Sequence, residues 1–309
     1  MLFRSLLFWV DAHFPAIRIE GNSSVPVTVD VVYDGWRNER RELTGSEMIS
    51  AYGIQYGPNP IIVEPDTVFV RKDALIWCHH NTRSIWNETL RVQAIDELAQ
   101  TEKDPLLHRT FGAFVQGTKF TGKSPKELTA TAVKKFSLDV FTLTETAESV
   151  KEWETSVVRL ADDSKAIPLE RRRANHSDYW KNFWENNYIF VGSATDTTES
   201  LGVTHGYLLQ RYLNACASRG EMPVKFNGSL FNVDSAMVDF PYDADYRSWG
   251  GCYWWQNTRL PYWAMIHSGD FELMKPLFKM YMNALPLAKF RTTKYYGHAG
   301  AYFPETMYF

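Results

Sequence analysis

The chain of 309 residues has little cysteine: Cys78, Cys216 and Cys252 are its only thiols. Their wide spacing excludes a zinc knuckle, whose ligands come in closely spaced pairs, and their odd number argues against a disulfide framework. We therefore expect buried free thiols and no metal ion.

Blocks of like charge and long hydrophobic runs are also lacking. The net charge is −3 at pH 7 and charges of both signs are mixed, so neither nucleic acid nor a membrane surface is expected as a partner. The apolar run at residues 2–10 is too short to span a bilayer, and Asp11 interrupts it before any cleavage site of a signal peptide. We predict no signal peptide, although a truncated or misassigned one would look similar, and the localisation stays open.

Aromatic residues are abundant, at 15% of the chain with 11 Trp. Exposed aromatic rings stack on sugar rings, but large hydrophobic cores also use Trp. Both interpretations stay open at this point. No pattern in the chain indicates a cofactor.

Residues 1–160 are predicted to form an antiparallel β-sandwich. Several short segments are rich in β-branched and aromatic residues, and some of them alternate between apolar and polar side chains. These segments are residues 25–33, 67–70, 74–80, 111–117 and 136–144. Their number and spacing favour a sandwich over a helical domain. Residues 90–100 fit either a short helix or an edge strand.

A helical pattern follows at residues 145–161, where Val150, Trp153 and Val157 recur at helical spacing. Residues 162–178 contain Arg171–Arg173 and few apolar side chains, so we interpret them as a linker into a second domain. The Arg run is typical of a solvated helix face, and less so of a nucleic-acid or lipid patch.

Residues 179–309 follow the order helix, loop, helix, turn, helix, loop. One helix should begin near Thr197 and close by Gly220, and another should span residues 257–267 with Pro261 in its first turn. This order is typical of an array of αα-hairpins whose loops on one side carry the chemistry.

The end of the chain offers further signals for helix boundaries. Asp270 is a plausible N-cap, and Gly297 should end the helix that follows. The next element would start near Pro304–Glu305, which places Glu305 at the beginning of a helix.

Carboxylates, amides, an Arg and several Trp residues crowd residues 243–305. Aromatic faces stack on the C–H faces of a sugar ring, while amides, Arg and carboxylates bind its hydroxyls. The candidate substrate-binding residues are Asp243, Asp245, Arg247, Trp249, Trp254, Trp255, Gln256, Arg259 and His298.

Each candidate also has a structural interpretation. Asp243 and Asp245 could cap a helix or hold Ca²⁺ instead of sugar hydroxyls. Arg259 could be a paired residue that stabilises loops, and His298 could bond only a backbone carbonyl. Trp254 and Trp255 are adjacent, so one should be core and the other a stacking platform.

Several motifs resemble the alpha-L-fucosidases of glycoside hydrolase family 95 and their relatives. The segment Arg211-Tyr212-Leu213-Asn214-Ala215-Cys216-Ala217, followed by Lys225-Phe226-Asn227-Gly228-Ser229-Leu230-Phe231, is similar to the first barrel helix and its loop. Gln256-Asn257-Thr258-Arg259-Leu260-Pro261-Tyr262-Trp263 resembles the family's Asn-Thr motif with its following Tyr-Trp. Asp104-Pro105-Leu106-Leu107-His108-Arg109-Thr110-Phe111-Gly112 is similar to a stretch of the β-domain. We expect the chain to belong to a sister family of these enzymes with the same domain layout.

The resemblance implies an α+β multidomain protein: an N-terminal β-sandwich over residues 1–160, a linker at 161–178, and part of an (α/α)6 toroid over residues 179–309. It also implies an inverting glycosidase, in which Asn257 polarises the attacking water. The family's second Asn, two residues earlier, is Trp255 here, which puts that part of the mechanism in doubt. A catalytic base is expected on a helix beyond Phe309, and we interpret the chain as C-terminally truncated.

Glu305 is the candidate general acid. An aromatic pocket favours a protonated carboxyl, whereas a helix N-terminus favours an ionised one, so a purely structural role at a helix start is the alternative. The leading hypothesis is a glycoside hydrolase acting on an oligosaccharide or polysaccharide. The rivals are a glycoside phosphorylase and a non-catalytic, carbohydrate-binding or degenerate protein.

Overall fold

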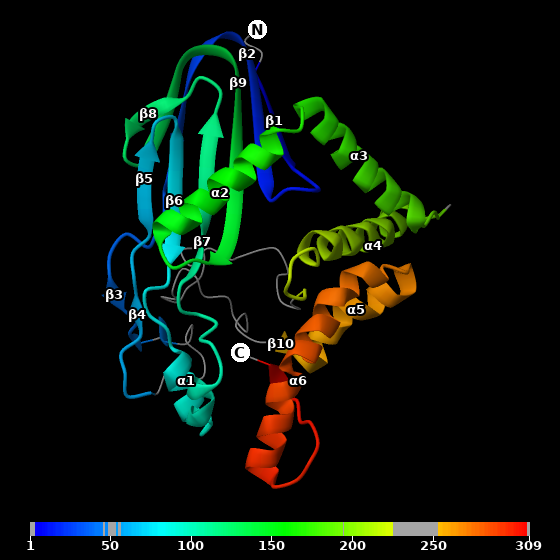
Figure 1. Cartoon of the computed structure of the whole chain (residues 1–309). Coiled ribbons are helices and arrows are strands. Elements are labelled where there is room, and N and C mark those ends of the chain that lie inside the picture. The colour runs from blue at the N-terminus through cyan, green and yellow to red at the C-terminus, as the bar shows by residue number, and fades with distance from the viewer. Residues whose placement is uncertain are drawn as a thin grey trace. The chain divides into compact units, whose positions relative to one another are not determined.

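The computed structural model describes residues 4–45, 47–48, 54, 57–193, 195–224 and 253–307. The chain divides into two compact units, which are described separately. The first contains residues 1–45 and 53–181, and the second contains residues 46–52 and 182–309. The class is α+β, with an antiparallel sheet in the N-terminal unit and helices after it (Figure 1).

A seven-stranded antiparallel sheet forms most of the first unit, in the order β1-β2-β9-β7-β6-β5, with β8 paired to β9. The strands are β1 Arg4–Val10, β2 Ala16–Val32, β5 Thr67–Arg71, β6 Ala74–His80, β7 Arg109–Gly117, β8 Thr121–Ser124 and β9 Glu127–Thr146. A separate small pair consists of β3 Arg41–Glu42 and β4 Ile62–Val63. The five predicted strand segments all lie in or largely within these strands.

Residues 90–100, which fitted either a helix or a strand, are helical. The helix α1 Trp86–Val92 is followed by a 3-10 helix at Asp96–Gln100. Residues 4–10 of the N-terminal apolar run form β1, which pairs along its whole length with β2.

Two apolar cores lie on the two faces of the sheet. On one face, Ile76, Phe114 and Phe141 pack against Trp153 and Val157 of α2 Val150–Lys165. Trp153 is fully buried, and its indole N–H donates to the carbonyl oxygen of Leu143 at 3.3 Å. The predicted helical stripe at residues 145–161 is therefore confirmed, and it covers the sheet (Figure 1).

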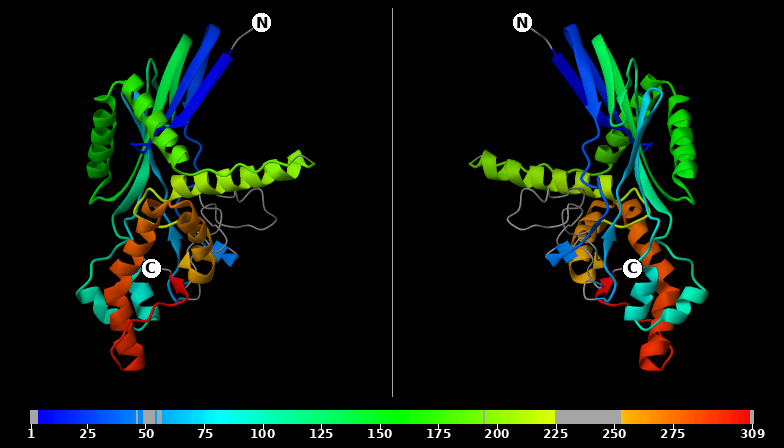
Figure 2. Two further views of the ribbon diagram at one scale, coloured as in Figure 1. Left: turned by 90° about the vertical axis from the view of Figure 1, so that its right-hand side faces the viewer. Right: turned by 90° about the vertical axis from the view of Figure 1, so that its left-hand side faces the viewer.

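On the other face, the longest strands fold over the sheet. The second core joins Leu128 and Ala130, near the start of β9, to Leu138 further along the same strand. Both long strands bend where their pairing shifts register, which occurs between Asn22 and Val29 of β2. The bend brings β8 against β5. Gly122 of β8 lies so close to Val70 of β5 that a Cβ atom added to the glycine would sit 2.6 Å from a Val70 methyl group. One curled sheet thus forms both layers, in place of the two separate sheets of the predicted sandwich (Figure 2).

The predicted linker at residues 162–178 consists largely of helix. It contains the end of α2 and the first part of α3 Leu169–Asn186, which runs past the division between the units at Lys181. Arg172 is buried, and its Nε donates to Asp11 Oδ2 at 2.9 Å. These residues have few apolar side chains because charged side chains, such as Arg172, attach the helix to the sheet.

Helices make up most of the described part of the second unit. They are the end of α3, α4 Thr197–Ala217, α5 Trp255–Ser268, a 3-10 helix at Phe271–Met274 and α6 Lys275–Tyr296, with the short strands β10 Tyr253–Trp254 and β11 Thr306–Met307. The helix predicted near Thr197 is confirmed, and its N-cap is Asp196, whose carboxylate accepts the N–H of Glu199 at 2.9 Å.

Pro261 lies in the interior of α5, because the helix begins at Trp255, two residues earlier than predicted. Its missing N–H leaves the carbonyl of Asn257 without its usual partner four residues on. Gly297 ends α6 in the left-handed region, with φ of 72°, as its position predicted. The (α/α)6 toroid expected for residues 179–309 stays a prediction.

The described thiols are free. Cys78 is fully buried and Cys216 is half-buried, whereas Cys252 lies outside the described residues.

Candidate functional site

The segment after α6 returns to the start of α5. Within it, the N–H of Tyr302 donates to the carbonyl of Ala288 at 3.4 Å. The strand β11 then pairs antiparallel with β10, matching Thr306 with Trp254. This return brings residues 303–305 beside the first turn of α5.

Glu305 immediately precedes β11, and the helix predicted to begin there does not form. Its backbone carbonyl accepts the N–H of Trp255 at 2.8 Å, and its side-chain Oε1 accepts the N–H of Gln256 at 2.8 Å. The carboxylate therefore satisfies a free N–H at the start of a helix distant in sequence. A local helix start could be predicted from sequence, but a two-residue strand pair between distant segments could not.

A pocket of about 480 Å³ opens beside this carboxylate. Its wall is aromatic: Trp255 meets Tyr281 edge-on with ring centroids 5.8 Å apart, and Tyr281 meets Phe303 at 5.2 Å. Leu277, Phe278, Met282 and Pro304 complete the lining with Glu305. The described part of the lining thus combines apolar walls with one acidic group.

Tyr281 and Glu305 interact electrostatically within the pocket. Burial raises the pKa of the Tyr281 hydroxyl, and the negative charge of Glu305 raises it further. The hydroxyl therefore stays protonated near neutral pH, and it can donate a hydrogen bond to a ligand.

Of the predicted site residues, Trp255 and Glu305 lie together in the pocket. Gln256 joins them through its backbone. Asn257 is half-buried in the first turn of α5. Trp254 is half-buried in β10, whereas Trp255 is 42% exposed, so Trp255 is the one available for stacking.

Two further predicted residues, Arg259 and His298, are described by the structure and are not among the described residues that line this pocket. In the described ranges, no acceptor reaches the buried Nε of Arg259. His298 is exposed, with Nδ1 at 3.0 Å from the carbonyl oxygen of Ala299 and its ring stacked on Tyr296. The other four predicted residues, Asp243, Asp245, Arg247 and Trp249, lie outside the described residues.

Sequence reasoning did not assign Tyr281 or Phe303 to the site. Tyr281 belongs to the apolar stripe of α6, where a Tyr is typical of a core. The sequence does not show that Tyr281 lies beside the segment that follows Gly297. Phe303 lies in the run before Glu305, but its pairing with Tyr281 depends on the return of the chain.

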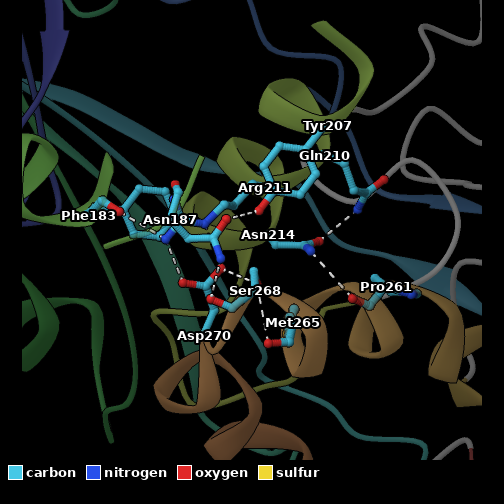
Figure 3. Close-up of polar contacts among 10 residues, drawn as sticks. All are labelled: Phe183, Asn187, Tyr207, Gln210, Arg211, Asn214, Pro261, Met265, Ser268 and Asp270. Atoms are coloured by element: carbon cyan, nitrogen blue, oxygen red, sulfur yellow. Dashed lines mark hydrogen bonds and ion pairs between the residues drawn. The ribbon is translucent and has the colours of Figure 1, made fainter. Parts of the chain in front are cut away.

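A buried polar cluster holds α5 in place (Figure 3). Arg211 of α4 is 3% exposed and makes two bonds to Asp270, from Nε to Oδ2 at 2.7 Å and from Nη2 to Oδ1 at 2.8 Å. Nη2 also donates to the carbonyl of Phe183 at 2.9 Å, and the guanidinium lies 3.9 Å from the centre of the Phe183 ring. Asp270 occupies the predicted N-cap position, before the 3-10 helix at Phe271–Met274, but its carboxylate makes no capping bond and accepts from Arg211 and Ser268 instead.

Amides extend the cluster on either side of the ion pair. Asn187 accepts a bond from the Tyr207 hydroxyl and donates to the carbonyl of Ser268 at 3.2 Å. Asn214 donates to the carbonyl of Pro261 at 3.4 Å. The cluster thus connects α3, α4 and the C-terminal half of α5, the helix whose first turn carries the pocket.

In the part of the chain that the structure describes, no three His, Cys, Asp or Glu side chains come together to hold a metal ion. Among the same residues, no helix is long and apolar enough to cross a bilayer.

Comparison with solved structures finds a similar fold in a protein from the human microbiome assigned as a kojibiose phosphorylase. The TM-score is 0.52 at 11% sequence identity, and the match covers 99% of this chain but 36% of that protein. The likeness shows a common fold, and the chain spans about a third of the length of that relative. No curated protein sequence matches the chain.

The N-terminal part of the sequence matches a family profile. The match extends over residues 3–189, which is more than half of the chain and includes the whole curled sheet. The chain therefore belongs to the family described as "Domain of unknown function (DUF5703)".

Proposed function

We propose that this chain is part of a carbohydrate-active enzyme that cleaves a glycosidic bond, with the pocket at Trp255, Tyr281 and Glu305 as a sugar subsite. The observation that carries the proposal is the carboxylate of Glu305 at an aromatic pocket of about 480 Å³. The fold shared with a protein assigned as a kojibiose phosphorylase supports it.

Glu305 is proposed as the general acid that protonates the leaving oxygen. Its Oε1 accepts the N–H of Gln256, so the proton of the acid form would reside on Oε2. Among the described residues, no donor occupies Oε2, which leaves that oxygen available to a substrate.

Sugar binding would rest on the aromatic rings. Trp255 is exposed enough to present a face to a sugar ring, and the Tyr281 hydroxyl can donate to a sugar oxygen. Asn257, one residue after Gln256, is proposed to polarise the attacking water, as the resemblance to the fucosidases implies.

The replacement Glu305→Gln tests the acid role directly. Glutamine keeps a side-chain oxygen that accepts the N–H of Gln256, so the start of α5 should be preserved while the transferable proton is lost. Turnover of aryl glycosides and oligosaccharides should be lost, and sugar affinity measured by calorimetry should stay within about twofold. The matched control is Glu272→Gln, because Glu272 is an exposed carboxylate of the same unit that pairs with Lys275.

Unchanged turnover in Glu305→Gln would remove this residue from the mechanism. Sugar binding without turnover in the unmodified protein would support the non-catalytic alternative.

A glycoside phosphorylase is the second candidate, because the similar structure carries that assignment. The two reactions differ in the nucleophile, which is water in a hydrolase and inorganic phosphate in a phosphorylase. Sugar 1-phosphate formed only when phosphate is present would establish the phosphorylase, and free sugar formed without phosphate would establish the hydrolase.

A further inference from the structure

The first unit contains a pocket of its own, of about 400 Å³, on the face of the sheet opposite α2. None of its lining residues belongs to the site proposed above. Pockets of this size commonly hold small molecules, particularly in the mouths of curled or barrel-like sheets.

The floor of this pocket is aliphatic. Leu75, Val115 and Leu138 are between 2% and 6% exposed, and Val31 and Val140 lie beside them in the lining. These side chains come from β2, β6, β7 and β9, so they are held by the paired strands of the sheet. A floor with no polar side chain accepts an apolar group and gives no partner to a buried hydroxyl or charge.

The wall above the floor is aromatic and rigid. The rings of Tyr33 and Trp77 lie 5.7 Å apart. The Tyr33 hydroxyl donates to Asp66 Oδ2 at 2.6 Å, and Arg37 Nε donates to Asp66 Oδ1 at 2.7 Å. Since the Arg37 and Asp66 side chains are 9% and 3% exposed, this pair fixes the wall and offers a ligand little net charge.

The rim differs from the floor and the wall. Trp36 is 59% exposed, although the next residue, Arg37, belongs to the buried ion pair with Asp66. The Arg37 guanidinium lies 5.4 Å from the centre of the Trp36 ring. Asp34 lines the same pocket and is exposed. Within the described ranges, Asp34 takes part in no ion pair. The rim therefore offers an aromatic face and an unpaired hydrogen-bond acceptor.

We propose that this pocket binds a small amphiphile, with an alkyl or aryl group on the aliphatic floor and a hydrogen-donating head between Trp36 and Asp34. Hydroxyls of a sugar or polyol and an ammonium group share this chemistry, since both donate to a carboxylate and both pack on an indole face. A carboxylate head is disfavoured because it would face Asp34.

The test uses the full chain and three probes with the same tail: hexyl β-D-glucoside, hexylammonium and hexanoate. Binding is measured by calorimetry and by tryptophan fluorescence. At least one of the first two probes should bind at least tenfold more tightly than hexanoate, and the better one identifies the natural head group. Equal affinity for all three probes, or binding of none, would overturn the proposal.

Variants locate the binding. Trp36→Ala should weaken the better probe about tenfold, and Val31→Phe should block the floor, while Asp34→Asn should reduce the preference over hexanoate. Trp263→Ala is the matched control, because Trp263 is exposed on α5 and is not among the described lining residues of either pocket, so it should leave the affinity of every probe unchanged. If Trp255→Ala abolishes binding and Trp36→Ala does not, the probes occupy the sugar subsite and the inference fails. Thermal unfolding of each variant verifies that it is folded.

Discussion

The guanidinium of Arg211 and the carboxylate of Asp270 meet through two parallel hydrogen bonds, of 2.7 and 2.8 Å. Both side chains are at most 10% exposed, and 59 positions separate them in the chain. This geometry is the bidentate pairing that best compensates for the loss of water around two charges. The pair fixes where the turn after α5 stands relative to α4.

Removing one partner of this pair should destabilise the second unit. Asp270→Asn leaves the Arg211 charge buried without its counter-ion, and the expected loss is about 3 kcal/mol in the free energy of unfolding. Urea unfolding monitored by tryptophan fluorescence measures it. The exposed pair of Glu272 and Lys275 supplies the control, because Glu272→Gln should leave the unfolding curve unchanged. Equal effects of the two substitutions would contradict a structural role for the buried pair.

The acid stability of the first unit should depend on Asp66. Burial alone would raise its pKa, but hydrogen bonds from His79, Arg37 and Tyr33 outweigh that effect and lower the pKa to about 2. A depressed folded-state pKa stabilises the fold above the unfolded-state value near 3.8, and this contribution disappears as the pH falls toward 2. Asp66→Asn should therefore be less stable than the parent by about 2 kcal/mol at pH 7, and the difference should shrink between pH 4 and 2. A difference that is independent of pH would show that packing, and not ionisation, is responsible.

The Cys78 thiol should be chemically inert in the folded protein. Burial raises its pKa to about 12, and the nearby charges of Asp66 and Glu154 act in the same direction. Since the thiolate is the reactive form, iodoacetamide at pH 8 should modify Cys78 only after unfolding. Peptide mapping by mass spectrometry can follow each thiol separately. Modification of Cys78 as fast as that of half-buried Cys216 in native protein would contradict the burial described here.

Two tryptophans on α5 should differ in their effect on sugar binding. Trp255 is 42% exposed and Trp263 is 54% exposed, but only Trp255 lines the pocket beside Glu305. Trp255→Ala should weaken sugar binding about tenfold, equivalent to about 1.4 kcal/mol, because the stacking surface is lost. Trp263→Ala should leave the affinity unchanged, and calorimetry with the same sugar compares the two. Equal losses would place the sugar elsewhere.

Local patterns in the sequence were sufficient for the elements whose signals are local. Alternation predicted the strand at residues 74–80, and helical spacing predicted the packing side of α2. Gly297 indicated its helix end because a left-handed residue is needed there. The prediction of a solvated helix face at residues 171–173 was wrong for Arg172, which is buried and bonded to Asp11, 161 positions earlier in the sequence.

The candidate site depended on contacts that no local pattern contains. Trp255 and Glu305 were predicted from their residue types, but they meet only because the short strands next to them, β10 and β11, pair with each other. The bonding of Asp270 to Arg211, and the pairing of Tyr281 with Phe303, likewise require the folded arrangement of helices. The family-95 resemblance and the toroid remain predictions.

The strand β9 is shared by both cores of the first unit. Leu128 and Leu138 belong to one core and Phe141 to the other, and the strand pairs with β2 and β7 over most of its 20 residues. Loss of either core would therefore break the same backbone ladder. The unit should consequently unfold in a single cooperative step, with uniformly slow amide hydrogen exchange along the middle of β9.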